Sequence, residues 1–267
     1  MQKTAKVRKI ATGTAGKAAG SIPRAAKILS CLSHNVNTVT DIANQCKLAK
    51  STVHRVLKLL EESHLVIEDP IDRSYFLGPL ITNLTINPAI THEFLIRCSD
   101  EEMKHLANIS EETVTLDILT GIQTVPLHEI TSLHEIRVTD DNRKFGSLYT
   151  GASSKVLLSQ FTDERLKVAM KYIEIPRMTE RTVTEKGVLM SQIRETREKG
   201  YAISYGERIQ GAICLSAPIL NYTAPVVLSI IGPEYRFKTR LEEVTRELID
   251  SAHRISRNVR EIYSTVG

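Results

Sequence analysis

The chain has 267 residues, of which 42% are hydrophobic and 25% charged, so its composition excludes a disordered, collagen-like or coiled-coil protein and suits one or two globular domains. Its formal net charge of +4 is uneven, because residues 1–80 contain 12 Lys and Arg against 6 Asp and Glu, whereas residues 81–267 contain 23 against 25. A cationic N-terminal third is typical of a nucleic-acid-binding module joined to a domain with another task, although a solvated basic surface would give the same count.

The chain has neither an apolar run of membrane-spanning length nor an apolar signal segment, so we expect a cytoplasmic protein. Its four cysteines lie at least 15 residues apart, which argues against a metal-binding cysteine pair and against a disulfide scaffold. We therefore predict reduced thiols, no metal site and no cofactor.

Residues 1–20 carry five basic side chains and no acidic one, and they are otherwise rich in Ala, Gly and Thr. This composition predicts a flexible basic arm. Such arms can enter the minor groove of DNA, but charged tails are also commonly only solvated, and the sequence leaves both interpretations open.

Three short helices are predicted after the arm. Apolar residues recur at helical spacing from Pro23 to about Ser33, a second helix is expected over 38–46 with Thr38 or Thr40 as its N-cap, and a third over 51–62. The third helix has one apolar face and one face of hydrogen-bond donors. Two short helices joined by a tight turn, the second rich in donors, are typical of a helix-turn-helix with its recognition helix.

A β-hairpin is predicted next, because residues 65–68 and 74–77 are strand-like and flank a turn at 69–72. A hairpin that follows a helix-turn-helix is a wing, and Arg73 at its tip is placed to meet a phosphate or the minor groove. Arg can pair with guanine, and Ser, Thr and Lys can contact bases or phosphates. The predicted DNA-binding residues are Lys50, Ser51, Thr52, His54, Arg55, Lys58 and Arg73.

The run LAKSTVHRVLKLLEESHLVIED, followed by YFLGP and preceded by SIPRAAKILSCL, resembles the winged-helix domain of the IclR family of bacterial transcriptional regulators. The resemblance implies a sequence-specific DNA-binding regulator. Dimers of helix-turn-helix proteins bind half-sites related by symmetry, so we expect a quasi-palindromic double-stranded operator and a homodimer or homotetramer, as in that family. Repression of a catabolic operon is the expectation, and activation stays open.

The remaining chain alternates strands and helices in an order that predicts an α+β domain with a largely antiparallel sheet. Ser99 is expected to open a helix as a capping box with Glu102. Further helices are expected over 151–172, 187–199 and 241–262, and strands over 112–119, 123–130, 212–220 and 226–231.

This half is similar to the IclR effector-binding domain in EETVTLDILTG, LYTGASSKVLL, EKGYAISYGERIQGAICLSAPI and VVLSIIGP, so the resemblance covers about residues 22–264. It implies a fold similar to GAF and PAS sensor domains. The predicted organisation is an arm at 1–20, a winged helix at 21–78, a connector at 79–97 and an effector-binding and oligomerisation domain at 98–267. Pro79 and Pro88 argue against one continuous helix across the connector.

The resemblance implies a small-molecule effector, often a carboxylate or an aromatic compound. Carried over by the motifs, the polar lining of its pocket falls on Ala152, Ser153, Ser204, Cys214 and Ser229. Backbone N–H groups at the start of the helix near Gly151 would suit an anion. Ser204 stands where many relatives have an acidic residue, and Ile231 where many have a serine, so we expect a less acidic and more apolar pocket.

Two alternatives remain. The departures at Ser204 and Ile231 are compatible with a degenerate pocket in a domain that only oligomerises. An enzyme is disfavoured, because the chain contains no GxSxG, SxxK, HExxH or phosphate-binding glycine motif, and we predict no catalytic residue.

Overall fold

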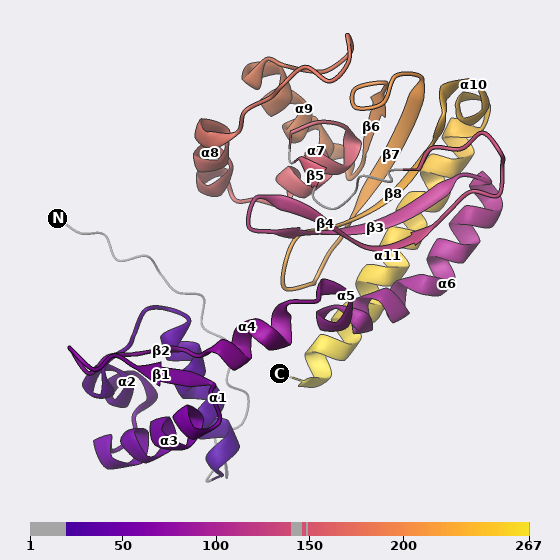
Figure 1. Ribbon diagram of the computed structural model, residues 1–267. Helices are drawn as coiled ribbons and strands as arrows, with labels where there is room; N and C mark the ends of the chain where they lie inside the picture. Colours follow the sequence, from indigo (N-terminus) through magenta and orange to yellow (C-terminus); the bar gives the residue numbers. More distant parts are fainter. Residues whose placement is uncertain (1–19, 140–145, 148, 267) are drawn as a thin grey trace. The chain divides into compact units, whose positions relative to one another are not determined.

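The structure is a computed structural model that describes residues 20–139, 146–147 and 149–266 (Figure 1). The chain separates into two compact units after Thr91, inside the predicted connector. The predicted basic arm, apart from Gly20, lies outside the described residues. No helix within the described ranges is both long and apolar enough to cross a membrane.

The first unit begins with three helices that surround one core. They are α1 (Ser21–Leu32), α2 (Val39–Cys46) and α3 (Lys50–Glu62). The amide of Asp41 donates to Thr38 Oγ1 at 3.2 Å, so Thr38 is the N-cap of α2. Ile28, Ile42 and Leu57 are fully buried where the three helices meet. The Sγ atoms of Cys31 and Cys46 lie 3.4 Å apart at the joint between α1 and α2, as free thiols.

A two-stranded antiparallel sheet, β1 (Val66–Glu68) and β2 (Tyr75–Leu77), follows the helices as the predicted wing. The amide of Tyr75 donates to the carbonyl of Asn37 at 2.8 Å and so ties the wing to the turn before α2. Gly78 then passes very close to the chain before β1, since its amide donates to Leu65 O at 2.8 Å. The segment after Gly78 forms α4 (Pro79–Thr85) and α5 (Pro88–Thr91), each beginning at a proline.

The second unit is a six-stranded antiparallel sheet with helices on both faces (Figure 1). The strand order is β5-β4-β3-β8-β7-β6. The strands are β3 (Thr113–Thr120), β4 (Gln123–Ile130), β5 (Gly146–Ser147), β6 (Ala202–Tyr205), β7 (Ala212–Ile219) and β8 (Val226–Pro233). The helices are α6 (Glu93–Ser110), α7 (Ala152–Ser159), α8 (Asp163–Tyr172), α9 (Lys186–Lys199), α10 (Glu234–Phe237) and α11 (Leu241–Val266), with a 3₁₀ turn at Lys238–Arg240.

The two faces of this sheet differ in chemistry because side chains alternate along a strand. Apolar residues of β3, β7 and β8, such as Leu116, Leu215 and Leu228, face α6 and α11 and form the main core. The other face is covered by α7, α8 and α9 over a smaller apolar cluster. Toward one end of that second face the strands carry polar residues instead.

Two predicted helix boundaries were wrong. Ser99 lies inside α6, which begins at Glu93, and its hydroxyl donates to Leu95 O at 2.8 Å, while Glu102 pairs with Arg254 of α11 at 2.7 Å. The span 151–172 is two helices, because Thr162 accepts from the amide of Arg165 and caps α8. The predicted winged helix and antiparallel α+β domain are confirmed.

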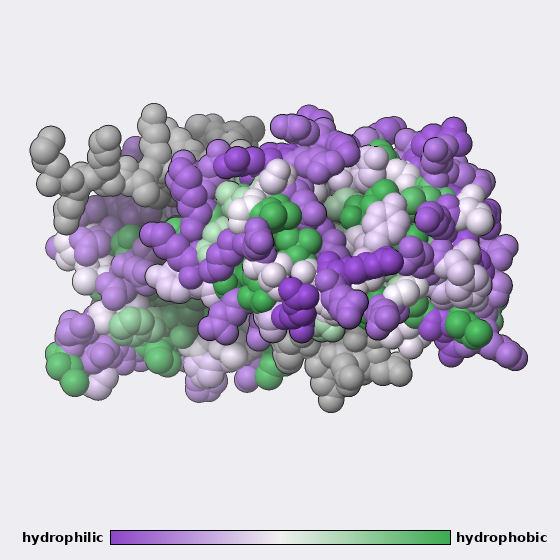
Figure 2. Space-filling view, turned by 90° about the horizontal axis from the view of Figure 1, so that it is seen from above, coloured by the Kyte–Doolittle hydropathy of each residue, from purple (hydrophilic) through white to green (hydrophobic). Residues whose placement is uncertain are grey.

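The surface is mainly hydrophilic where Figure 2 shows it, with apolar side chains in small separate groups. Scattered exposed apolar side chains are normal for a folded protein.

Candidate functional site

The recognition helix α3 is strongly amphipathic. Val53, Val56, Leu57 and Leu60 are buried against α1 and α2. Of the predicted DNA-binding residues on the helix, Lys50, Ser51, His54 and Arg55 are exposed, and Thr52 and Lys58 are half-buried. The helix therefore presents donors on one continuous face, which is the chemistry required to contact a DNA groove and its phosphates.

Two predicted phosphate contacts meet at one acidic residue that sequence reasoning missed. Glu68 of β1 lies 3.2 Å from Lys58 Nζ and 2.8 Å from Arg73 Nε, while Lys58 also pairs with Glu61 at 2.8 Å. The structure thus brings the recognition helix and the wing tip together through a carboxylate. An acid at the end of a short strand gives no sequence signal of that contact.

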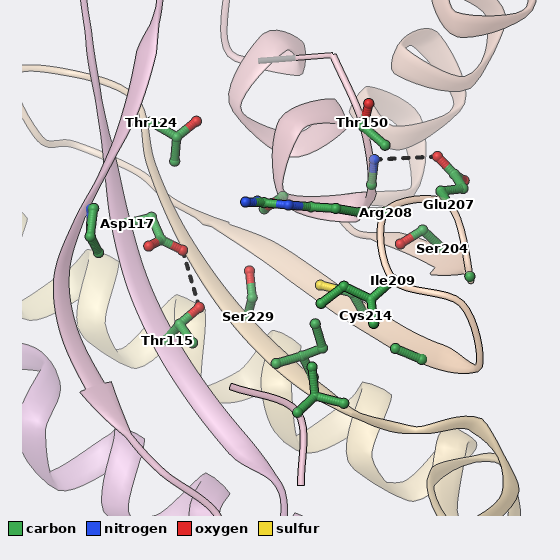
Figure 3. Close-up of a pocket in the computed structure, with 17 residues that line it drawn as sticks. Thr115, Asp117, Thr124, Thr150, Ser204, Glu207, Arg208, Ile209, Cys214 and Ser229 are labelled. Carbon is green, nitrogen blue, oxygen red and sulfur yellow. Dashed lines mark hydrogen bonds between the residues drawn. The ribbon is translucent and has the colours of Figure 1, made fainter. Parts of the chain in front are cut away.

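A pocket opens on the polar part of the second sheet face, between β3, β4, β7 and β8, the start of α7 and the loop after β6 (Figure 3). Its volume is about 60 Å³, several times the roughly 10–15 Å³ that one water needs. The pairing of the strands brings the residues at the base of the pocket together, since Thr115 of β3 pairs with Ser229 of β8, and Ile231 of β8 pairs with Cys214 of β7. Four predicted residues line the pocket, namely Ser153, Ser204, Cys214 and Ser229.

Ala152 does not line the pocket, and two of the amides expected to suit an anion, those of Gly151 and Ala152, are engaged within the protein. The amide of Ala152 donates to Ser204 Oγ at 3.0 Å, and that of Gly151 donates to Glu207 Oε2 at 3.3 Å. Gly151 has φ +87° and ψ 176°, a conformation open essentially only to glycine, which lets the chain turn into α7 there. Both amides therefore position the protein's own groups.

Hydroxyl groups dominate the polar lining. Ser229 Oγ lies 2.8 Å from Ser216 Oγ, and Thr115 donates to Asp117 at 3.1 Å. The hydroxyls of Thr124 and Thr150 are buried in the pocket wall and have no hydrogen-bond partner within the described part of the chain. A buried hydroxyl without a partner costs free energy, so these two groups are ready to bind a ligand or water.

Charged side chains that sequence reasoning did not assign to the pocket also line it. They are Asp117, Glu207 and Arg208. Figure 3 shows the Arg208 side chain extending from the loop after β6 toward Thr124 and Asp117. The pocket therefore contains carboxylates even though Ser204 replaces an acidic residue. The signal that could have revealed Asp117 is a lone charge in the otherwise uncharged strand TVTLDILT.

Glu207 is anchored by a buried ion pair. Lys155 of α7 and Glu207 are 3% and 8% exposed, and Lys155 Nζ lies 2.5 Å from Glu207 Oε1. Because the carboxylate also accepts from the Gly151 amide, its two oxygens fix the loop after β6 against α7. This leaves Arg208, the next residue, on a rigid base beside the pocket.

Within residues 20–139, 146–147 and 149–266, no three His, Cys, Asp or Glu side chains are grouped so that they could hold an ion.

Two family models match the chain, "IclR helix-turn-helix domain" over residues 21–70 and "Bacterial transcriptional regulator IclR C-terminal" over residues 88–257. The transcriptional regulator TtgV of Pseudomonas putida is 31% identical over 249 residues, which cover 91% of this chain and 94% of that protein. KdgR of Escherichia coli is 29% identical over 221 residues, covering 82% and 84%.

Solved structures share the fold. IclR of Thermotoga maritima superposes with a TM-score of 0.60 at 24% identity, covering 90% of this chain and 98% of the other. An IclR homologue from Microbacterium hydrocarbonoxydans, crystallised with 4-hydroxybenzoate, gives 0.57 at 20% identity, covering 91% and 100%. TtgV and KdgR are transcriptional regulators and not enzymes. The chain belongs to the IclR family of bacterial transcriptional regulators and is a DNA-binding regulator of that type.

Proposed function

We propose that the protein is a repressor of a catabolic operon whose operator binding is controlled by a small organic effector, a carboxylate or an aromatic compound, held in the pocket of the second unit. The observation that carries this proposal is the pocket itself, where Arg208 extends toward Thr124 and Asp117, and where the buried hydroxyls of Thr124 and Thr150 have no hydrogen-bond partner among the described residues. A guanidinium binds a carboxylate by paired hydrogen bonds, and hydroxyls orient the rest of the ligand. The 4-hydroxybenzoate complex of a family member supports this class of ligand for such a fold.

On the DNA side, the proposed contacts are the outward residues of α3 (Lys50, Ser51, Thr52, His54 and Arg55) in the major groove, with Lys58 and the wing residue Arg73 at phosphates. A homodimer or homotetramer would place two recognition helices on a quasi-palindromic operator in the cytoplasm. In this scheme residues 21–78 bind DNA, 79–97 transmit the signal, and 98–267 bind the effector and oligomerise. Control requires that the effector bind the operator-competent and incompetent states with different affinities.

The test is binding of the full chain to the DNA upstream of its own gene. Fluorescence anisotropy at two salt concentrations, with and without small carboxylates and aromatic acids, distinguishes three outcomes. Specific binding that one acid changes supports the proposal. Specific binding that ignores every acid favours the degenerate pocket, and purely non-specific binding argues that this DNA is not the operator.

Arg208→Gln is expected to weaken binding of an acid effector by about 10- to 150-fold, since a hydrogen bond to a charged group contributes about 1.5–3 kcal/mol. Isothermal titration calorimetry with the acid found in the anisotropy screen measures the loss. Arg194→Gln, at an exposed position on α9 outside the pocket, is the charge-matched control and should bind the acid normally. Equal affinities for both variants would show that Arg208 does not bind the effector.

Arg55→Gln is expected to lower operator affinity by about 1–3 kcal/mol, or roughly 5- to 150-fold, because an exposed Arg on a recognition helix contacts bases or phosphates. Lys27→Gln, exposed on α1, removes the same charge from the same unit and serves as the control. Anisotropy titrations of the two variants should differ clearly. If they coincide, Arg55 contributes only net charge.

A further inference from the structure

The carboxylate of Glu68 lies between the recognition helix and the wing, and each of its oxygens holds a different cation. Oε2 is 3.2 Å from Lys58 Nζ, and Oε1 is 2.8 Å from Arg73 Nε. The side chain of Glu68 is 8% exposed, whereas those of Lys58 and Arg73 are 44% and 69% exposed. The acid is therefore covered by the two cations that face solvent. A DNA phosphate that approaches either cation must compete with the Glu68 carboxylate for it.

Local structure fixes this arrangement. Glu68 ends β1 opposite Tyr75, which is 1% exposed. The wing turn is closed by the amide of Asp69 on Ser74 O at 2.7 Å and by that of Arg73 on Asp69 O at 3.0 Å. Arg73 has φ +61°, a left-handed conformation that the turn imposes. Its side chain thus starts from a fixed point beside Glu68.

The charges in the cluster cancel. Burial on its own raises the pKa of Glu68, but the hydrogen bond from Lys58 and the positive charge of Arg73 outweigh it, so the net shift of the pKa is downward. Glu68 is therefore ionised at neutral pH. Lys58 also pairs with Glu61 at 2.8 Å, so two cations face two carboxylates. By contrast, no ion pair with another described residue involves Arg55 on the same helix.

We propose that Glu68 is a specificity-determining residue, which holds Lys58 and Arg73 on a protein carboxylate and thereby lowers the affinity of the protein for DNA of arbitrary sequence. Sequence-independent binding depends on the number of cations that neutralise phosphates. Each such cation steepens the slope of the logarithm of the binding constant against the logarithm of the salt concentration by about 0.9. Base contacts depend on donors of α3 that Glu68 does not touch. Glu68 therefore lowers the affinity for DNA of arbitrary sequence more than it weakens base recognition. The ratio of operator affinity to non-specific affinity rises as a result. The inference requires DNA binding by the first unit but not control by a ligand.

The experiment uses the full chain, a random-sequence duplex of about 30 base pairs, and anisotropy titrations across salt concentrations. Glu68→Gln keeps the size of the side chain and removes its charge. It is expected to bind the duplex about 3- to 10-fold more tightly, with a logarithmic salt slope steeper by about 1–2 as one or two cations are released. Glu62→Gln removes the same charge from an exposed position at the end of α3, where Glu62 pairs with no described residue, and should leave the slope unchanged.

A second background tests the mechanism. In Arg73→Gln, the additional change Glu68→Gln should steepen the slope by at most half as much, because only Lys58 is left to release and Glu61 still pairs with it. Arg73→Gln alone should hardly change the slope, since its charge is already compensated, whereas Arg55→Gln should reduce it by about 1 if Arg55 contacts a phosphate. This single variant tests the proposal even if Glu68→Gln does not fold. The proposal fails if Glu68→Gln binds like wild type or more weakly, if Glu62→Gln matches its gain, or if Arg73→Gln loses a full unit of slope.

Discussion

Glu207→Gln is expected to lower the free energy of unfolding of the second unit by about 3–5 kcal/mol, because it leaves the buried ammonium of Lys155 without its partner. Lys155 is 3% exposed, so water cannot replace the lost carboxylate without opening the packing of α7. The Gly151 amide also loses a charged acceptor. Hydrogen exchange of peptides from β7 and β8, followed by mass spectrometry, measures the loss in the full chain, because core amides report global opening.

The control for this prediction is Glu195→Gln. Glu195 pairs with Lys199 at 2.5 Å on the exposed side of α9, and surface pairs contribute only about 0–1 kcal/mol. The double variant Lys155→Met with Glu207→Leu should recover most of the stability, since an apolar pair can replace a buried ion pair. Similar losses for Glu207→Gln and Glu195→Gln would mean that the buried pair contributes no more than a surface pair.

Gly78→Ala is expected to destabilise the first unit by about 3 kcal/mol, as overpacking against backbone does. A Cβ at this position would lie 2.3 Å from the carbonyl oxygen of His64 and 2.9 Å from Leu65 C. These are backbone atoms, and the hydrogen bond from Gly78 to Leu65 O holds them in place, so relief requires the wing to move. Exchange rates of peptides from α3 and β1 should rise accordingly.

Gly187→Ala is the matched control for Gly78→Ala. Gly187 lies in the first turn of α9, and a Cβ there has no atom within 4 Å. Alanine is the better helix former, so this change should be neutral or stabilising by up to about 1 kcal/mol. If Gly78→Ala were equally well tolerated, the close approach between Gly78 and the start of the wing would not be a constraint.

The elements that the sequence predicted well are those whose signal is local. The apolar spacing of α3 and the turn at 69–72 locate the recognition helix and wing within a residue or two. Predicted helix boundaries were wrong where tertiary packing outweighs a local motif. Ser99 looks like a helix cap in the sequence, but it lies inside a longer helix, α6, that packs on α11. Of the residues carried over from the family motifs, Ser153, Ser204, Cys214 and Ser229 line the pocket.

The rest of the candidate site depends on contacts between distant segments. Thr115 and Asp117 reach the pocket only because β3 pairs with β8 in one register, and no local pattern states that register. Arg208 lines the pocket because its neighbour Glu207 is fixed by a lysine 52 residues earlier. Likewise, the contact of Glu68 with Lys58 and Arg73 joins a helix to a wing. In the sequence alone, each of these residues looks like an ordinary surface charge.

The thiol contact between α1 and α2 gives the first unit an internal chemical reporter. Burial, together with the neighbouring Cys46, raises the pKa of Cys31 to about 12, so almost none of it is thiolate at neutral pH. Since the thiolate is the nucleophile, an alkylating reagent modifies Cys31 only when the helices separate and the thiol regains its normal acidity. The labelling rate of this one cysteine therefore counts the openings of the helix-turn-helix joint, and a DNA duplex that holds the joint closed would slow it.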